Sequence, residues 1–147
     1  MNTKSVIRIA VRVGVAVVVG FLLIGILGAL GHQLVGRHLL ERAGWVPGAD
    51  PPALYVWFTL AKGFGAAVLA GAAVAKIART FAIHAAVILV GLGTAQGVSQ
   101  IVTIVESHPH WYAFVLPLLM VPGVPLGVLL VRRVFPDPVP VEQPEES

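Results

Sequence analysis

The amino-acid sequence predicts an all-α, polytopic membrane protein, a bundle of four transmembrane helices with both termini in the cytoplasm. Three observations carry this prediction: the composition, four long apolar runs and an uneven distribution of basic residues. Hydrophobic residues make up 57% of the 147 residues and charged residues only 12%, whereas soluble domains average about 45–50% and about 25%. This deficit of charge argues against a soluble globular domain. Nucleic-acid binding is not expected either, because the basic residues are spread along the chain and form no basic face.

Long runs without Asp, Glu, Lys or Arg mark the expected helices. A helix needs roughly 20 residues to cross about 30 Å of hydrocarbon, and we place the spans at about 13–36, 54–77, 80–105 and 110–131. Lys62 interrupts the second run, which we count as a span with an ionisable residue inside it. The first run is longer than the 7–15 residue apolar core of a cleaved signal peptide, so we expect it to remain as a span.

The basic residues flank these spans unevenly, and the asymmetry predicts their orientation. Seven of them lie next to the two termini or in the connection between the second and third spans, against two in the first loop. By the positive-inside rule, the side with seven is cytoplasmic. Interfacial aromatic residues are expected on the outer side, where Tyr55 and Trp57 open the second span and Trp111 and Tyr112 open the fourth.

The spans and their short loops fill residues 1–133, which we expect to form a single transmembrane domain. Residues 134–147 are rich in proline and acidic residues, so we expect a disordered cytoplasmic tail that buries no core. The chain contains no cysteine, which excludes disulfides, thiolate metal sites and thiol redox chemistry.

Small residues follow one face of the second span and recur in the third. Helices in lipid associate through close packing, which small residues permit. We expect these residues to pack the bundle internally, and a homo-oligomer or a docking face on a larger membrane complex stays open as the alternative. They are Gly63, Ala67, Gly71 and Ala75 in the second span and Gly93 and Gly97 in the third. In the fourth span, Pro117, Pro122 and Pro125 predict a kinked helix.

Polar residues inside the spans supply the candidate site, because each is costly in lipid and needs a partner. Lys62 either snorkels towards the outer headgroups along its long stem or takes a functional interior position. His32 should face protein or a polar cavity, since its Cβ leans back towards the bilayer centre. We expect one polar cluster in the outer half of the bundle, held by interhelical hydrogen bonds or surrounding a ligand cleft. Its members are His32, Lys62 and the polar face of the third span, namely Gln96, Ser99, Gln100 and Glu106.

Histidines offer two further possibilities. Glu106, His108 and His110 are close together in the third loop and could bind Zn²⁺ or Cu²⁺ if His32 or His38 joined them, although the start of the fourth helix explains the same residues. Four-helix membrane bundles can also hold haem through paired histidines. His32 and His84 lie at opposite ends of the bundle and cannot share one iron, which leaves ligation of haem or a chlorophyll-like pigment by a single histidine. The sequence specifies no particular cofactor.

Three short segments together resemble a loose group of small, uncharacterised bacterial membrane proteins with four helices. They are Leu30-Gly31-His32, Ala61-Lys62-Gly63-Phe64-Gly65, and His108-Pro109-His110-Trp111 leading to Pro117. The resemblance covers about residues 10–133 and implies a four-helix fold in the bacterial cytoplasmic (inner) membrane. It implies no particular activity. The group often has His in place of Lys62 and an acidic residue in place of Gly28, so a shared ionisable site does not carry over.

We find no catalytic set of residues with sensible spacing. We therefore expect a non-enzymatic membrane protein, either an accessory or scaffolding subunit or a small-ligand-binding protein. One alternative is an oligomeric transporter or channel with a polar path along Lys62, Gln96 and Gln100. Another is a haem, pigment or metal protein that uses His32, His108 and His110.

Overall fold

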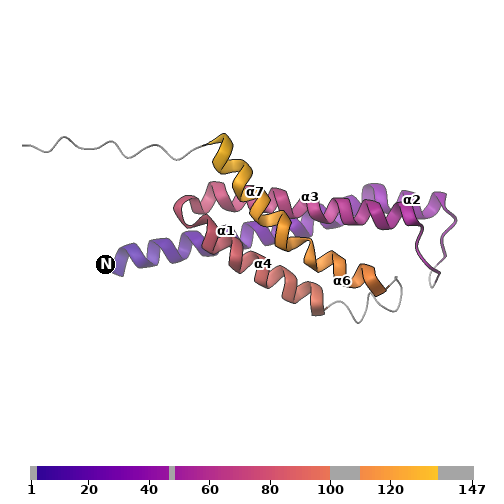
Figure 1. Ribbon diagram of the computed structural model, residues 1–147, viewed down its shortest axis with the longest axis horizontal. Helices are drawn as coiled ribbons and strands as arrows, with labels where there is room; N and C mark the ends of the chain where they lie inside the picture. Colours follow the sequence, from indigo (N-terminus) through magenta and orange to yellow (C-terminus); the bar gives the residue numbers. More distant parts are fainter. Residues whose placement is uncertain (1–2, 47–48, 100–109, 136–147) are drawn as a thin grey trace, which may run out of the picture.

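The computed structural model describes residues 3–46, 49–99 and 110–135, and these form helices joined by turns and loops (Figure 1). The all-helical class is confirmed for this part of the chain. A π-helical turn, His32–Gly36, joins α1 to α2, and a 3-10 turn, Arg79–Phe81, joins α3 to α4. The helices are α1 (Thr3–Gly31), α2 (Arg37–Arg42), α3 (Ala53–Ala78), α4 (Ala82–Ser99), α6 (His110–Leu118) and α7 (Met120–Val134). Of the predicted tail, residues 136–147 lie outside the described residues.

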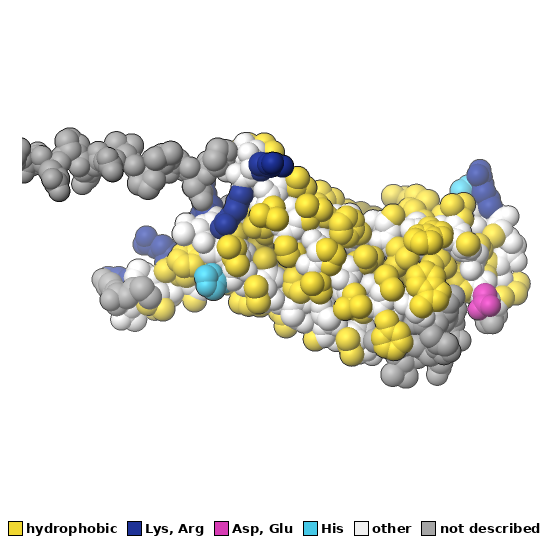
Figure 2. Space-filling view, in the orientation of Figure 1, with side chains coloured by type: hydrophobic (Ala, Val, Ile, Leu, Met, Phe, Trp, Pro, Cys, Tyr) yellow, Lys and Arg dark blue, Asp and Glu magenta, His cyan; other side chains and the backbone are white. Residues whose placement is uncertain are grey.

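Three helical stretches are long and apolar enough to cross a membrane: Thr3–Arg42, Ala53–Ser99 and Phe114–Val134. Most of their apolar surface is not buried inside the protein, since at most 39% of the most apolar window of any of them is buried. Figure 2 shows apolar side chains over the middle of the molecule, with Lys and Arg gathered towards its two ends. An apolar flank between charged ends is the surface expected of a membrane protein.

The stretch Ala53–Ser99 reverses direction at Arg79. Arg79 has a φ of 45°, a left-handed conformation that non-glycine residues rarely adopt, and it ends α3. The chain then returns as α4, which runs antiparallel to α3 and packs against it (Figure 1).

Arg12 ties α1 to this turn. The last four carbonyls of a helix have no donor within the helix. The guanidinium Nε of Arg12 donates to the Ile77 carbonyl over 2.6 Å, which satisfies one of the terminal carbonyls of α3. A cation at the carboxyl end of a helix is also favoured by the helix dipole. The two helices are therefore joined at the end where α3 turns into α4.

The main core is built of small side chains around α3, which packs against α1, α4 and α7. Alanine is the commonest residue in this core, so the helix axes can approach closely. Leu89, Val74 and Val124 are the largest fully buried side chains. A second, smaller cluster lies between α3 and α6 and contains Val56, Leu60 and Tyr112.

The closest helix contact joins α3 to α7, and glycine permits it from both sides. A Cβ added at Gly71 would overlap the backbone carbonyl of Val124, and one added at Gly127 would overlap the carbonyl of Val68. Backbone therefore lies against backbone at both positions. The small-residue face predicted for the second span packs inside the chain here.

The predicted glycine pair of the third span also packs internally. A Cβ at Gly93 would overlap the Met120 side chain, and one at Gly97 would overlap Pro117. These contacts seat α4 on α6 and on the start of α7. Pro117 lies inside α6, which ends one residue later, and Pro125 lies inside α7.

We expect Gly71→Ala to lower the free energy of unfolding by about 1–3 kcal/mol, because its Cβ would push α7 away from α3. Gly91→Ala is the matched control, since no atom lies within 4 Å of the position of its added Cβ. That change should be neutral or slightly stabilising through helix propensity. Circular dichroism of the two variants in detergent, followed against denaturant, makes the comparison. Equal midpoints would contradict the backbone contact.

Candidate functional site

Lys62 lies in the middle of α3 and turns across the bundle to α1. Its ammonium Nζ donates a hydrogen bond of 3.0 Å to the carbonyl oxygen of Gly28. Its aliphatic stem lies over Gly31, where an added Cβ would overlap the stem. The ammonium also lies 5.8 Å from the centre of the Phe58 ring, within the range of a cation–π contact. Glycine at position 31 therefore leaves room for the lysine stem between α1 and α3.

Lys62 has no acidic partner among the described residues. The one ion pair found there joins Arg37 and Glu41 at 3.8 Å, and the other described carboxylate, Asp50, forms none. An ammonium has three donors and no acceptor, and the contact with Gly28 uses one of them. The remaining N–H groups are therefore open to an acceptor from outside this part of the chain.

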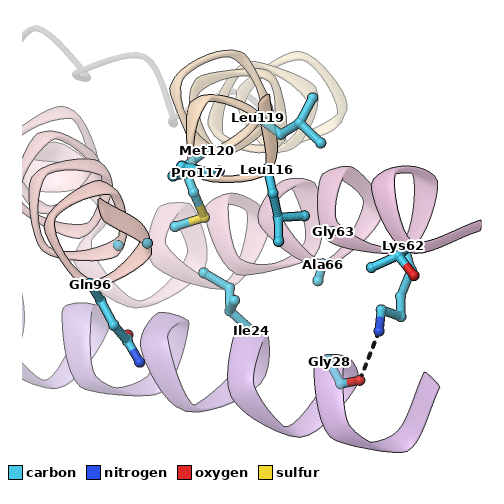
Figure 3. Close-up of a pocket in the computed structure, with 13 residues that line it drawn as sticks. Ile24, Gly28, Lys62, Gly63, Ala66, Gln96, Leu116, Pro117, Leu119 and Met120 are labelled. Atoms are coloured by element: carbon cyan, nitrogen blue, oxygen red, sulfur yellow. Dashed lines mark hydrogen bonds between the residues drawn. The ribbon is translucent and has the colours of Figure 1, made fainter. Parts of the chain in front are cut away.

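A cavity of about 280 Å³ adjoins Lys62 between α1, α3, α4 and the junction of α6 with α7. Figure 3 shows Lys62 at one end and Gln96 at the other, both directed towards α1. The walls between them are mainly apolar, with Thr59 as the third polar side chain. The remaining lining residues are Ile24, Gly28, Gly63, Ala66, Gly93, Gly97, Leu116, Pro117, Leu119 and Met120.

Gln96 borders more than this one cavity. It also lines a space of about 130 Å³ with Phe21 and Ile24, and another of about 390 Å³ with Val18 and Leu22. All three spaces lie along the line where α4 faces α1. Gln96 itself is exposed, so the cavity beside Lys62 opens to the outer surface of the bundle between α1 and α4.

Proline contributes to the wall opposite α1. Pro117 has no N–H and cannot donate the hydrogen bond that the Ala113 carbonyl would accept in a regular helix. The chain recovers regular bonding directly afterwards, since Leu119 N donates to the Val115 carbonyl and Gly123 N to the Leu119 carbonyl, both over 3.1 Å. The proline expected to kink the fourth span therefore stands at the cavity wall.

His32 lies apart from the Lys62 cavity. It begins the π-helical turn, and its Nδ1 is 3.4 Å from the Tyr55 hydroxyl. The two rings meet edge to face, with centroids 6.2 Å apart. The buried Gly36 gives them room, because an added Cβ there would lie 3.0 Å from His32 Nδ1. Short π-helical segments often occur at functional sites, but this histidine faces a tyrosine of α3 rather than the cavity.

The structure thus brings together two members of the predicted cluster, Lys62 and Gln96. Ser99 is exposed at the end of α4, where its hydroxyl donates to the Gln96 carbonyl over 2.7 Å. Gln100, Glu106 and His108 lie outside the described residues. His110 begins α6, but its side chain also lies outside the described part.

No group of three or more His, Cys, Asp or Glu residues within the described ranges is arranged to hold a metal ion. The side chains of the metal ligands predicted in the third loop lie outside the described part of the chain. The described part of the chain therefore offers polar binding groups around Lys62 and leaves the histidine hypotheses untested.

Two residues of the site region were not predicted. Thr59 is buried, lines the cavity, and its hydroxyl donates to the Tyr55 carbonyl over 2.9 Å. Tyr112 was expected at the interface with Trp111, but it is only 3% exposed and forms a hydrogen bond with the Thr59 side chain. Thr59 precedes Lys62 by three residues, and residues three apart lie on one face of a helix. This spacing could have predicted Thr59 as a neighbour of Lys62.

No protein-family model, curated protein or solved structure matches this chain. The functional argument therefore rests on the geometry around Lys62.

We expect Lys62→Met to leave the protein folded and to change the free energy of unfolding by less than about 1 kcal/mol. Interhelical hydrogen bonds in membranes average about 0.6 kcal/mol, and the loss of this one removes no charge partner, since Lys62 forms no ion pair among the described residues. Lys76→Met is the matched control in the same helix, since Lys76 lies over the Phe135 ring and outside the cavity. Denaturant titration measures both variants. If Lys62→Met lowered the free energy of unfolding much more than the control did, the ammonium would have a structural role.

Proposed function

We propose that this chain is a small, non-enzymatic membrane protein that binds a small amphiphilic ligand in the Lys62 cavity. It crosses the bacterial cytoplasmic membrane four times, with both termini in the cytoplasm. The single observation that carries the binding proposal is the Lys62 ammonium at the edge of a largely apolar cavity, with no carboxylate partner among the described residues.

The reversal at Arg79 supports four crossings rather than three. The stretch Ala53–Ser99 has 47 residues, and a straight helix of that length would measure about 70 Å. That is more than twice the roughly 30 Å of the hydrocarbon core. Because α3 and α4 lie side by side and antiparallel, each supplies one crossing in our proposal. The Lys and Arg residues at the ends of α1 and α7 and at the Arg79 turn then face the cytoplasm, as the positive-inside rule requires.

The chemistry of the cavity favours an anionic head on an apolar body. An ionised lysine within a membrane is costly unless an anion or strong acceptor compensates it. Gln96 supplies a neutral donor and acceptor at the other end. The apolar walls between them suit a hydrocarbon segment. A long-chain carboxylate combines these features, so we take it as the probe.

The arrangement suits binding better than catalysis. The Thr59 hydroxyl donates to a backbone carbonyl of its own helix, and Gln96 is neither an acid nor a base. An accessory subunit of a larger membrane complex is the second form of the proposal. It is favoured by the open face of α1, where nothing lies within 4 Å of an added Cβ at Gly14 or Gly25.

Single cysteines test the four-span topology, since the natural chain contains none. We expect cysteines introduced at Ser5 and Thr80 to be protected from a membrane-impermeant thiol reagent in intact cells and to react after the cells are opened. A cysteine at Ala49 should react in intact cells. Reaction of position 80 from the outer side would contradict the four-span arrangement.

Binding of spin-labelled stearate tests the ligand proposal. In nanodiscs of neutral phosphatidylcholine, we expect Lys62→Met to weaken its binding about tenfold, which corresponds to a loss of about 1.4 kcal/mol. Lys76→Met should leave binding unchanged, because that lysine lies outside the cavity. The methyl ester of the same probe, which lacks the charge, should bind wild type and Lys62→Met alike. Equal stearate binding by the two lysine variants would overturn the proposal.

A further inference from the structure

A second groove lies between α4 and α7, on a face that does not include the Lys62 cavity. It has a volume of about 380 Å³. Eight of its nine lining residues are apolar, and the exception is Arg132, in the last turn of α7. The apolar residues are Ile83, Ala86, Val87 and Val90 from α4 and Val121, Pro125, Val128 and Leu129 from α7.

The groove has a long apolar wall and one cationic end, which complements the acyl chain and the anionic headgroup of a phospholipid. It is apolar from Val121 to Leu129 and ends at Arg132. A guanidinium binds phosphate with two parallel hydrogen bonds. Basic side chains gather around the end of α7 in Figure 2, where Arg132 and Arg133 stand in its last turn, so the groove ends in a region of positive charge.

The length of the groove fits one leaflet of a bilayer. Along α7 it runs from Val121 to Arg132, which is eleven residues or about 16 Å. Half of the hydrocarbon core of a typical bilayer measures about 15 Å. An acyl chain that starts at the headgroup level beside Arg132 would therefore reach the middle of the bilayer at Val121.

We propose that this groove holds one acyl chain of an anionic phospholipid whose phosphate group binds Arg132. The occupant is a lipid rather than another helix of a protein, because the charge lies at one end of the groove and the remaining wall is apolar. This site is independent of the Lys62 cavity. It requires only that α7 crosses the membrane with Arg132 at one surface.

Native mass spectrometry of the protein released from mixed phosphatidylglycerol and phosphatidylcholine nanodiscs tests this site. We expect the wild-type protein to retain one phosphatidylglycerol in preference to phosphatidylcholine. Arg132→Gln should reduce the retained phosphatidylglycerol at least fivefold. Arg133→Gln is the matched control: it removes the same charge at the same depth, but Arg133 does not line the groove, so the change should be less than twofold.

A second variant tests the apolar part of the groove. Val87 is 67% exposed and lines the groove, so Val87→Trp fills it without disturbing the core and should also lower retention at least fivefold. Soluble glycerophosphoglycerol should not displace the lipid, because it lacks the acyl chain. Equal effects of the two arginine variants, or retention of phosphatidylcholine equal to that of phosphatidylglycerol, would overturn the proposal. So would displacement by the soluble headgroup.

Discussion

The backbone contact between α3 and α7 determines where the Lys62 cavity and the groove between α4 and α7 lie. Lipid provides no hydrophobic drive for two helices to associate, so contact area must stabilise the pair. Gly71 and Gly127 allow the two backbones to touch, and this fixes the position of α7. The preceding helix then places Pro117 against Gly97, which closes one wall of the Lys62 cavity. On its other side, α7 faces α4 and leaves the groove that ends at Arg132.

Two cations bind helix carbonyls in this protein, with different consequences. Arg12 satisfies a terminal carbonyl of α3 that has no donor in its own helix, so its contact completes the helix end. Lys62 donates to the carbonyl of Gly28 in the last turn of α1, but there the chain continues directly as the π-helical turn His32–Gly36 and then as α2. Arg12 instead lies where α3 stops. Lys62 also borders the cavity, which is why we assign a binding role to Lys62 and a structural role to Arg12.

Much of the helical layout could be predicted because apolar runs and glycine spacing are local properties of the sequence. Lys62 was recognisable for the same reason, as a charge inside an apolar run. Depth within the spans predicted that Lys62 and Gln96 share a polar cluster, and both line one cavity. The same argument also put His32 in that cluster, whereas it faces Tyr55, because depth alone does not specify which helix a side chain faces. Nor does Arg79 carry the usual signal of a left-handed turn, which is glycine or asparagine.

The glycine contacts also bear on how such a sequence can change over time. At Gly71 and Gly127 the obstructing atoms are backbone, so a smaller side chain on the facing helix cannot make room for a larger one. Outward-facing residues such as Val98 and Leu130 carry no such restriction and can exchange among apolar types. Sequence divergence would therefore remove most of the overall identity between this chain and a distant homologue before it replaced these two glycines. The spacing of the two glycines is thus a better criterion for finding such a homologue than overall sequence identity.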